Sequence, residues 1–198
     1  DREIALCPAR IDLAEVQREI QSERARESIL KKRLEAVRGQ YDVILIDTPP
    51  SLGEMLENGL TAADAVLIPV AAAPWAMDGL PGILGTIAGN KEDLNPVLEI
   101  AGLLPTRYAQ VRVSKDMLGE YKTFADKHGL QLFDAIPEAT LYEQTAYWNV
   151  IAASVEGDQR SVDPYVHLAR ELRDRYFPLP RAGGDAVEAA DDAVSEVG

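Results

Sequence analysis

The chain has 198 residues, 46% of them hydrophobic, which is enough to bury the core of one domain. Its net charge of −13 repels polyanions and argues against constitutive, charge-driven binding to nucleic acid. A single cysteine cannot form an internal disulfide, and the apolar runs are shorter than the roughly 20 residues that a membrane span needs. We therefore expect a cytoplasmic protein without a membrane segment.

Short apolar runs alternate along the chain with longer segments of helical periodicity. Runs that are apolar throughout are typical of strands covered on both faces, as in a parallel sheet wrapped by helices. The sequence therefore predicts an α/β fold, doubly wound, with a mostly parallel sheet and helices on both faces. The predicted strands are residues 4–6, 43–46, 66–70, 98–104 and 130–136.

Helices are expected between these strands because apolar residues recur there at helical spacing. The first region carries two apolar stripes separated by the polar run 22–27, and either two helices or one helix with a weak middle would fit. The stripes are Leu13, Val16 and Ile20, then Ile29 or Leu30 with Leu34 and Val37. Further helices are predicted at about 54–63, 78–90, 113–128 and 162–176.

The last residues differ in composition from the rest. Residues 181–198 are small and acidic and contain no aromatic side chain, so we expect a disordered tail. Residues 1–180 are then expected to form one domain.

The segment that carries chemistry is residues 41–70, in which an apolar run delivers Asp47 at its C-terminal end. Ligands of open α/β sheets bind beyond the C-terminal ends of the strands. A carboxylate there can accept a hydrogen bond from a water on magnesium and so hold the metal against nucleotide phosphates. The alternative is that Asp47 caps a turn or the following helix.

The wider pattern favours the first interpretation. An apolar strand, the sequence D-T-P-P-S-L-G at 47–53, a helix, and then A-A-D-A-V-L-I-P-V at 62–70 resemble the ParA/MinD family of partition and positioning ATPases. The resemblance continues through G-L-L-P-T-R-Y at 102–108 and A-I-P-E at 135–138, and its order is that of the ParA branch.

The resemblance implies roles for particular residues. Asp47 matches the aspartate that serves magnesium through water, and it is the catalytic candidate. The loop from Thr48 and Pro49 to residue 53 matches the nucleotide-sensing switch. The family's base-recognition loops are matched by Thr106–Arg107 and Pro137–Glu138, although each could simply be a loop after a strand.

The resemblance also implies a function, namely an ATPase switch for plasmid or chromosome partitioning, with ATP and magnesium as cofactors. The ATP-bound homodimer of such a protein binds DNA nonspecifically and is then nucleoid-associated, and a ParB-like partner stimulates hydrolysis. An acidic, alanine-rich end is not the basic amphipathic helix that a membrane-bound relative would need.

Two departures from the family pattern stand out. The phosphate-binding loop ends in Gly-Lys-Thr, yet no lysine follows a glycine anywhere in this chain, so we expect that portion of the domain to lie outside these residues. Glu138 and Leu141 occupy a loop where basic residues that reach DNA are expected. DNA contact would then shift to Arg112, Lys115 and Lys122, or to Arg170, Arg173 and Arg175, unless these side chains are merely solvated.

Two other functions stay open. One is a ParA-like ATPase that positions a protein cargo. The other is a truncated, non-catalytic interaction module that keeps the partner surfaces but binds no nucleotide; the intact Asp47 loop argues against it, because such a module has no need of that loop.

Overall fold

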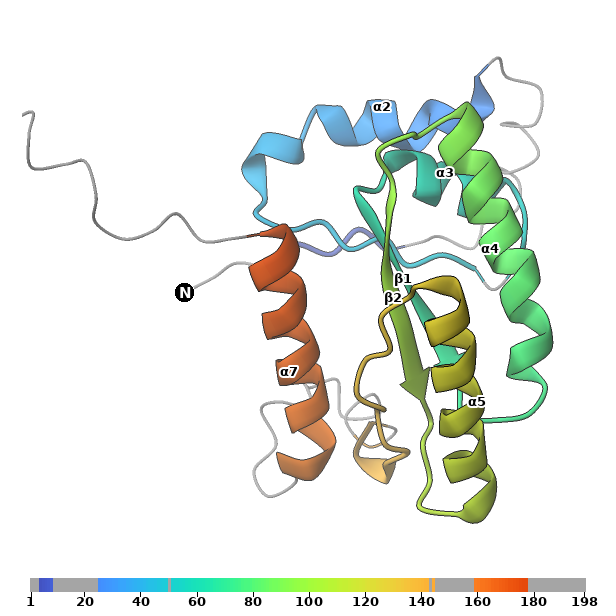
Figure 1. Cartoon of the computed structure of the whole chain (residues 1–198). Coiled ribbons are helices and arrows are strands. Elements are labelled where there is room, and N and C mark those ends of the chain that lie inside the picture. Colours follow the sequence, from blue (N-terminus) through green and yellow to red (C-terminus); the bar gives the residue numbers. More distant parts are fainter. Residues whose placement is uncertain (1–3, 9–24, 50, 143, 145–158, 178–198) are drawn as a thin grey trace, which may run out of the picture.

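The computed structural model describes residues 4–8, 25–49, 51–142, 144 and 159–177. The expected first helical stripe at 13–20 and the acidic tail at 181–198 lie outside the described residues. Helical elements come first, and helices and strands then alternate from α3 to α5 (Figure 1). They are η1 (Arg26–Ser28), α2 (Ile29–Glu35), η2 (Arg38–Gln40), α3 (Glu54–Ala62), β1 (Ala65–Ala71), α4 (Ala76–Asp93), β2 (Glu99–Thr106), α5 (Arg112–His128) and α7 (Gln159–Tyr176).

The two strands β1 and β2 pair in parallel, with Ile68 opposite Leu103. A further extended segment continues the parallel arrangement beyond β2, through single bridges from Leu103 to Leu132 and from Tyr108 to Pro137. Helix α4 connects β1 to β2, which is the crossover that parallel strands require. The prediction of an α/β fold is confirmed.

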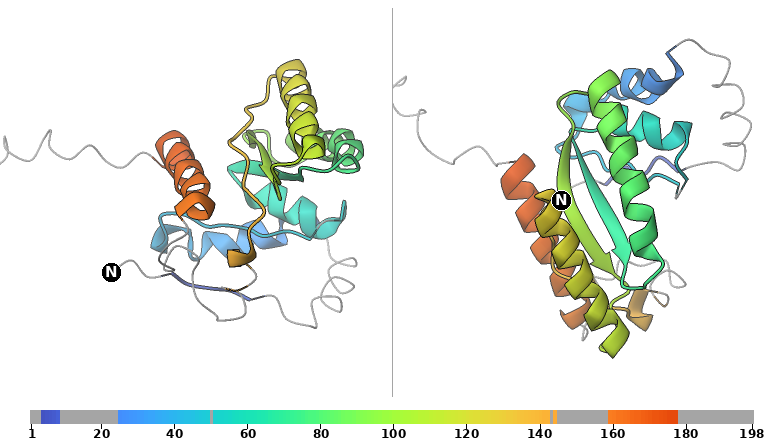
Figure 2. Two further views of the ribbon diagram at one scale, coloured as in Figure 1. Left: turned by 90° about the horizontal axis from the view of Figure 1, so that it is seen from below. Right: turned by 45° about the vertical axis from the view of Figure 1, so that its right-hand side comes forward.

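The two faces of these strands are covered by different helices. On one face, Ile68 and Leu103 belong to a core that includes Leu80 of α4 and Tyr121 of α5. On the other face, Leu104 packs with Phe133 and Ile136, and Leu168 and Leu172 of α7 lie against them. Seen from below in Figure 2, α7 stands on one side of the strands and α4 and α5 on the other. The alternation of adjacent strand residues between the two cores explains why the strands are apolar throughout.

The prediction of strands at residues 4–6 and 43–46 is wrong. Neither segment forms strand pairs, and β2 is the one strand that pairs with β1 among the described residues. A strand exists only where a neighbour takes up its backbone N–H and C=O groups, and no described segment does so here. Leu45 is accordingly 89% exposed and Ile4 is 82% exposed.

The predicted helices that fall on described residues are present, with ends shifted by a few residues. The apolar stripe of Leu34 forms α2, and the four later predictions correspond to α3, α4, α5 and α7. Helix α5 is capped at its C-terminus by Gly129, whose φ of 64° is the left-handed conformation that commonly closes a helix. None of the helices in the described part of the chain is long and apolar enough to cross a membrane.

A glycine in β2 gives the first testable prediction. Gly102 has φ 152°, and a Cβ built there would lie 2.5 Å from the carbonyl oxygen of Gln131. Gly102→Ala should therefore lower the free energy of unfolding by about 1–3 kcal/mol from backbone strain, and the clash with the carbonyl oxygen should lower it further. Gly119→Ala is the matched control, because its Cβ would meet nothing within 4 Å on α5, and it should stabilise by about 0.5–1 kcal/mol. Equal denaturation midpoints for the two variants would contradict this packing.

Candidate functional site

The start of the loop that follows Asp47 packs against α3. The side chain of Asp47 is exposed, whereas Thr48 is half-buried. The Cγ2 atom of Thr48 lies only 2.8 Å from where a Cβ on Gly59 would stand, and Cγ2 of Ile46 lies 3.7 Å from the same point. Because Gly59 has no side chain, the segment of residues 43–48 can approach α3 this closely. The arrangement presents the Asp47 carboxylate to solvent at the start of a supported loop.

The far end of this loop reaches α4. The Cδ1 atom of Leu52 lies 3.5 Å from where a Cβ on Gly82 would stand, although Leu52 is 60% exposed. The loop therefore contacts α3 at its start and α4 near its end. Helix α3 begins directly afterwards, with Gly53 as its N-cap.

Helix α3 is itself held by a buried amide. Asn58 donates from Nδ2 to the carbonyl oxygens of Arg26 and Glu54, each at 2.9 Å, and its Oδ1 accepts from the N–H of Leu30 at 3.1 Å. A buried amide with both ends paired fixes its helix to the neighbouring segment. Asn58 thus joins α3 to the start of α2, and the Asp47 loop rests on a fixed support.

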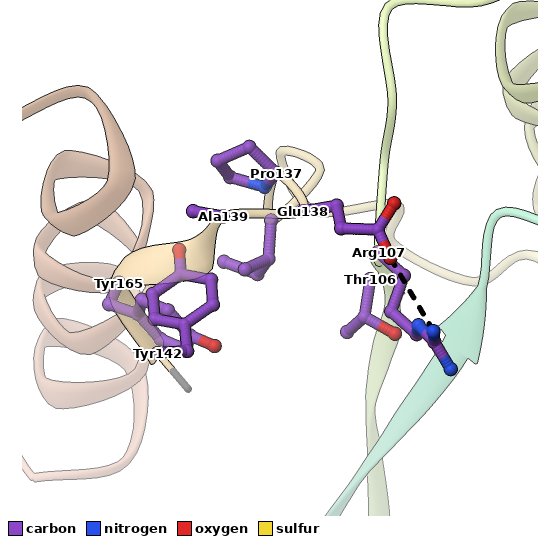
Figure 3. Close-up of a pocket in the computed structure, with 8 residues that line it drawn as sticks. Thr106, Arg107, Pro137, Glu138, Ala139, Tyr142 and Tyr165 are labelled. Carbon is purple, nitrogen blue, oxygen red and sulfur yellow. Dashed lines mark hydrogen bonds and ion pairs between the residues drawn. The ribbon is translucent and has the colours of Figure 1, made fainter. Parts of the chain in front are cut away.

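A second group of candidate residues forms a pocket of about 370 Å³ beyond the C-terminal end of β2 (Figure 3). The pocket contains all four residues predicted to recognise a base. Its lining is Thr106, Arg107, Ile136, Pro137, Glu138, Ala139, Tyr142 and Tyr165. The structure thus brings the two predicted base-recognition loops together, while Asp47, Thr48 and Pro49 form no part of this lining.

Backbone hydrogen bonds hold the two loops together. The N–H of Tyr108 donates to the carbonyl of Ile136 at 3.0 Å, and the N–H of Glu138 donates to the carbonyl of Tyr108 at 2.9 Å. Arg107 has a positive φ of 53°, which turns the chain sharply after β2. Its Nη2 lies 3.4 Å from Oε1 of Glu138, but both side chains are mostly exposed, so this ion pair contributes little stability and can open for a ligand.

Sequence reasoning gave no ligand role to two tyrosines that line the pocket. The rings of Tyr142 and Tyr165 meet edge to face, with centroids 5.8 Å apart and planes at 89°. The Tyr142 hydroxyl donates to the carbonyl oxygen of Ser161 at 2.7 Å, and burial raises the pKa of the Tyr165 phenol. No sequence pattern predicts that Tyr165 lies beside the loop at residues 137–139.

The predicted nucleic-acid contacts lie on α5. Arg112, Lys115 and Lys122 are exposed, and the Nε of Arg112 is 3.7 Å from Oδ2 of Asp116. Lys115 and Lys122 are two turns apart and therefore share one face of the helix. Leu141 is buried, so it offers no surface to DNA.

The alternative set on α7 is partly engaged in the fold. Arg175 donates from Nη1 to the carbonyl oxygen of Ala101 at 3.1 Å, and its Nη2 is 3.4 Å from Oε2 of Glu99. Arg173 pairs with Asp174 at 2.6 Å, whereas Arg170 is exposed. This favours α5 over α7 as the basic surface.

Asp47 belongs to no group of three or more His, Cys, Asp or Glu side chains that could hold a metal ion, as far as the described residues are concerned. Asp47 is exposed, and the role predicted from the sequence, in which one carboxylate reaches a hydrated cation through water, stays a prediction.

Comparison with known proteins shows what class this α/β arrangement belongs to. The family model described as an AAA domain matches residues 1–100. The chromosome-partitioning ATPase Soj of Treponema pallidum is 34% identical over 167 residues, which is 83% of this chain and 65% of that protein. The sporulation initiation inhibitor protein Soj of Bacillus subtilis is 42% identical over 122 residues, covering 61% of this chain and 48% of the relative.

Among solved structures, cobyrinic acid a,c-diamide synthase from Mycobacterium smegmatis with bound ATP analogue and magnesium matches with a TM-score of 0.71. The identity is 32%, over 87% of this chain and 64% of that one. The chain belongs to the ParA/MinD-type family of ATPases, as its motifs predict. It spans less than two thirds of the length of these relatives.

Proposed function

We propose that the whole protein containing these residues is a ParA-like ATPase that acts as a switch in DNA partitioning. The observation that carries the proposal is the Asp47 loop, which displays an exposed carboxylate at the end of an extended segment and is braced on α3 through Gly59. Relatives of matching sequence are named as partitioning ATPases, and the matching synthase structure contains an ATP analogue and magnesium.

The residues present fit two parts of a magnesium–nucleotide complex. The pocket beyond β2 has room for a purine base and offers both apolar and polar groups, as small-molecule sites do. The Asp47 carboxylate can accept a hydrogen bond from a water on magnesium, and magnesium when bound neutralises charge on the phosphates. The described residues and the rest of the chain contain no Gly-Lys pair to cradle those phosphates.

We further propose three finer properties, which are those that the resemblance to the family implies. They are ATP-dependent homodimerisation, nonspecific DNA binding by the dimer, and hydrolysis stimulated by a ParB-like partner. The exposed Lys115 and Lys122 on α5 are the basic groups that we propose for the DNA contact.

A second function is favoured by the charge and burial pattern of the chain. Glu138 is exposed and Leu141 is buried at the positions where DNA-binding arginines were expected, and the chain carries a net charge of −13. These features suit a ParA-like ATPase that positions a protein cargo. Loss of DNA binding with retained ATP hydrolysis would select this second function.

Nucleotide binding by residues 1–198 alone gives the second prediction. Without a lysine loop to donate hydrogen bonds and countercharge, binding of Mg-ATP to this chain should be too weak for calorimetry to detect. The whole protein should hydrolyse ATP when magnesium is present and stop when it is chelated. Micromolar affinity of residues 1–198 for ATP would contradict the account of the phosphate site, and absence of magnesium-dependent hydrolysis in the whole protein would contradict the proposed function.

A further inference from the structure

The pocket beyond β2 has an aromatic side that the loops alone do not supply. Figure 3 shows Thr106 and Arg107 on one side, and Tyr142 with Tyr165 on the other. Tyr165 comes from α7, and the residue is 45% exposed although its ring packs edge to face on Tyr142. A large aromatic ring that stays half open beside a pocket is available to a ligand in that pocket.

Tyr165 is held in this position by the docking of α7. Leu168 and Leu172 pack against the core formed by Leu104, Phe133 and Ile136. Farther along the helix, Oε2 of Glu171 accepts a hydrogen bond from Nε2 of Gln131 at 2.9 Å. Near the start of the helix, the carbonyl of Ser161 accepts the hydroxyl of Tyr142 at 2.7 Å. The ring of Tyr165 is therefore positioned before any ligand arrives, which lowers the ordering cost of contacting one.

The chemistry of the pocket matches a flat heteroaromatic ring. Ile136, Pro137 and Ala139 offer apolar surface, while Thr106 and Glu138 offer polar groups at the opposite edge. A base has an apolar face and a polar edge, and stacking on an aromatic side chain stabilises any base through its π-face. We propose that Tyr165 contacts the nucleotide base and makes α7 part of the nucleotide site. This inference rests on the proposed function, since it assumes that the pocket takes the base of ATP.

The test compares a nucleotide with a probe that lacks the base. Affinities of the whole protein for Mg-ATP and for Mg-tripolyphosphate are measured for the wild type and for Tyr165→Ala, Tyr165→Leu and Tyr165→Phe. Removing the ring should weaken ATP binding by about tenfold or more, in the range reported for base–aromatic contacts, and leave tripolyphosphate binding unchanged. Tyr165→Phe should bind ATP like the wild type. His167→Ala is the control, because His167 is exposed on the same helix and does not line the pocket.

The possible outcomes separate this inference from the proposed function. Wild-type affinity for ATP in both Tyr165→Ala and Tyr165→Leu overturns the inference and leaves the proposed function standing. An equal loss of ATP and tripolyphosphate binding also overturns it, because the substitution then damages the fold rather than a base contact. If the wild-type protein binds neither probe, both proposals fail. As a direct readout, the Tyr165 ring resonances of the wild type should shift with ATP and stay in place with tripolyphosphate; identical spectra with the two probes would count against the contact.

Discussion

Replacing Asp47 by alanine should reduce magnesium-dependent ATP hydrolysis by the whole protein by about 10–100-fold, the loss typical of a group that holds a metal through its outer shell. The carboxylate is exposed at the end of the extended segment, so its removal should change the free energy of unfolding by less than about 0.5 kcal/mol. Activity and stability should therefore separate. Steady-state hydrolysis against magnesium concentration, measured alongside thermal unfolding, checks both expectations.

Asp42→Ala is the matched control for this experiment. Asp42 is an exposed carboxylate in the same extended segment, but it precedes the apolar run rather than ending it. Its loss should leave the magnesium dependence of hydrolysis unchanged. If Asp47→Ala hydrolyses ATP like the wild type, or if Asp42→Ala is equally impaired, Asp47 is not the residue that serves the metal.

Features of this site that follow from local sequence pattern or from general sheet geometry could be predicted, whereas those that depend on how distant segments dock could not. Thr106 ends β2 and Glu138 follows the parallel bridge at Pro137, so their convergence at the strand ends follows from the general geometry of such sheets. The helices were predictable because each carries an apolar stripe that the core covers. The place of Tyr165 was not, because it depends on how α7 docks on Leu104 and Phe133.

The segment at 43–46 shows where apolar composition fails to predict a strand. Its apolar composition is the same kind of signal that correctly predicted β1, yet only β1 has a strand beside it among the described residues. Composition reports that a segment suits burial on both faces, whereas strand formation also needs a hydrogen-bonding neighbour. Ile46 and Thr48 nevertheless pack on α3 next to Gly59, and the role of Asp47 stays a prediction.

Reversing the charge of Lys115 and Lys122 together should abolish DNA retention by the ATP-bound whole protein. The two side chains are exposed on one face of α5, and each contact with a phosphate releases counterions, so binding should also fall steeply with salt. Lys122→Glu alone should weaken retention and flatten its salt dependence by about one unit of slope. Lys127→Glu is the control, since it makes the same charge change on the same helix but on another face, and it should leave retention nearly unchanged. Equal losses for Lys122→Glu and Lys127→Glu would indicate a general charge effect and remove α5 as the contact.

The most direct test of the partition-switch account is DNA retention by the unmodified whole protein in different nucleotide states. At about 50 mM salt, near the low end where phosphate contacts are strongest, the account predicts retention with Mg-ATP and release with Mg-ADP. Retention that is independent of nucleotide would contradict a switch. Absence of retention in every nucleotide state at that salt concentration would contradict DNA partitioning itself, and positioning of a protein cargo would then be the better account.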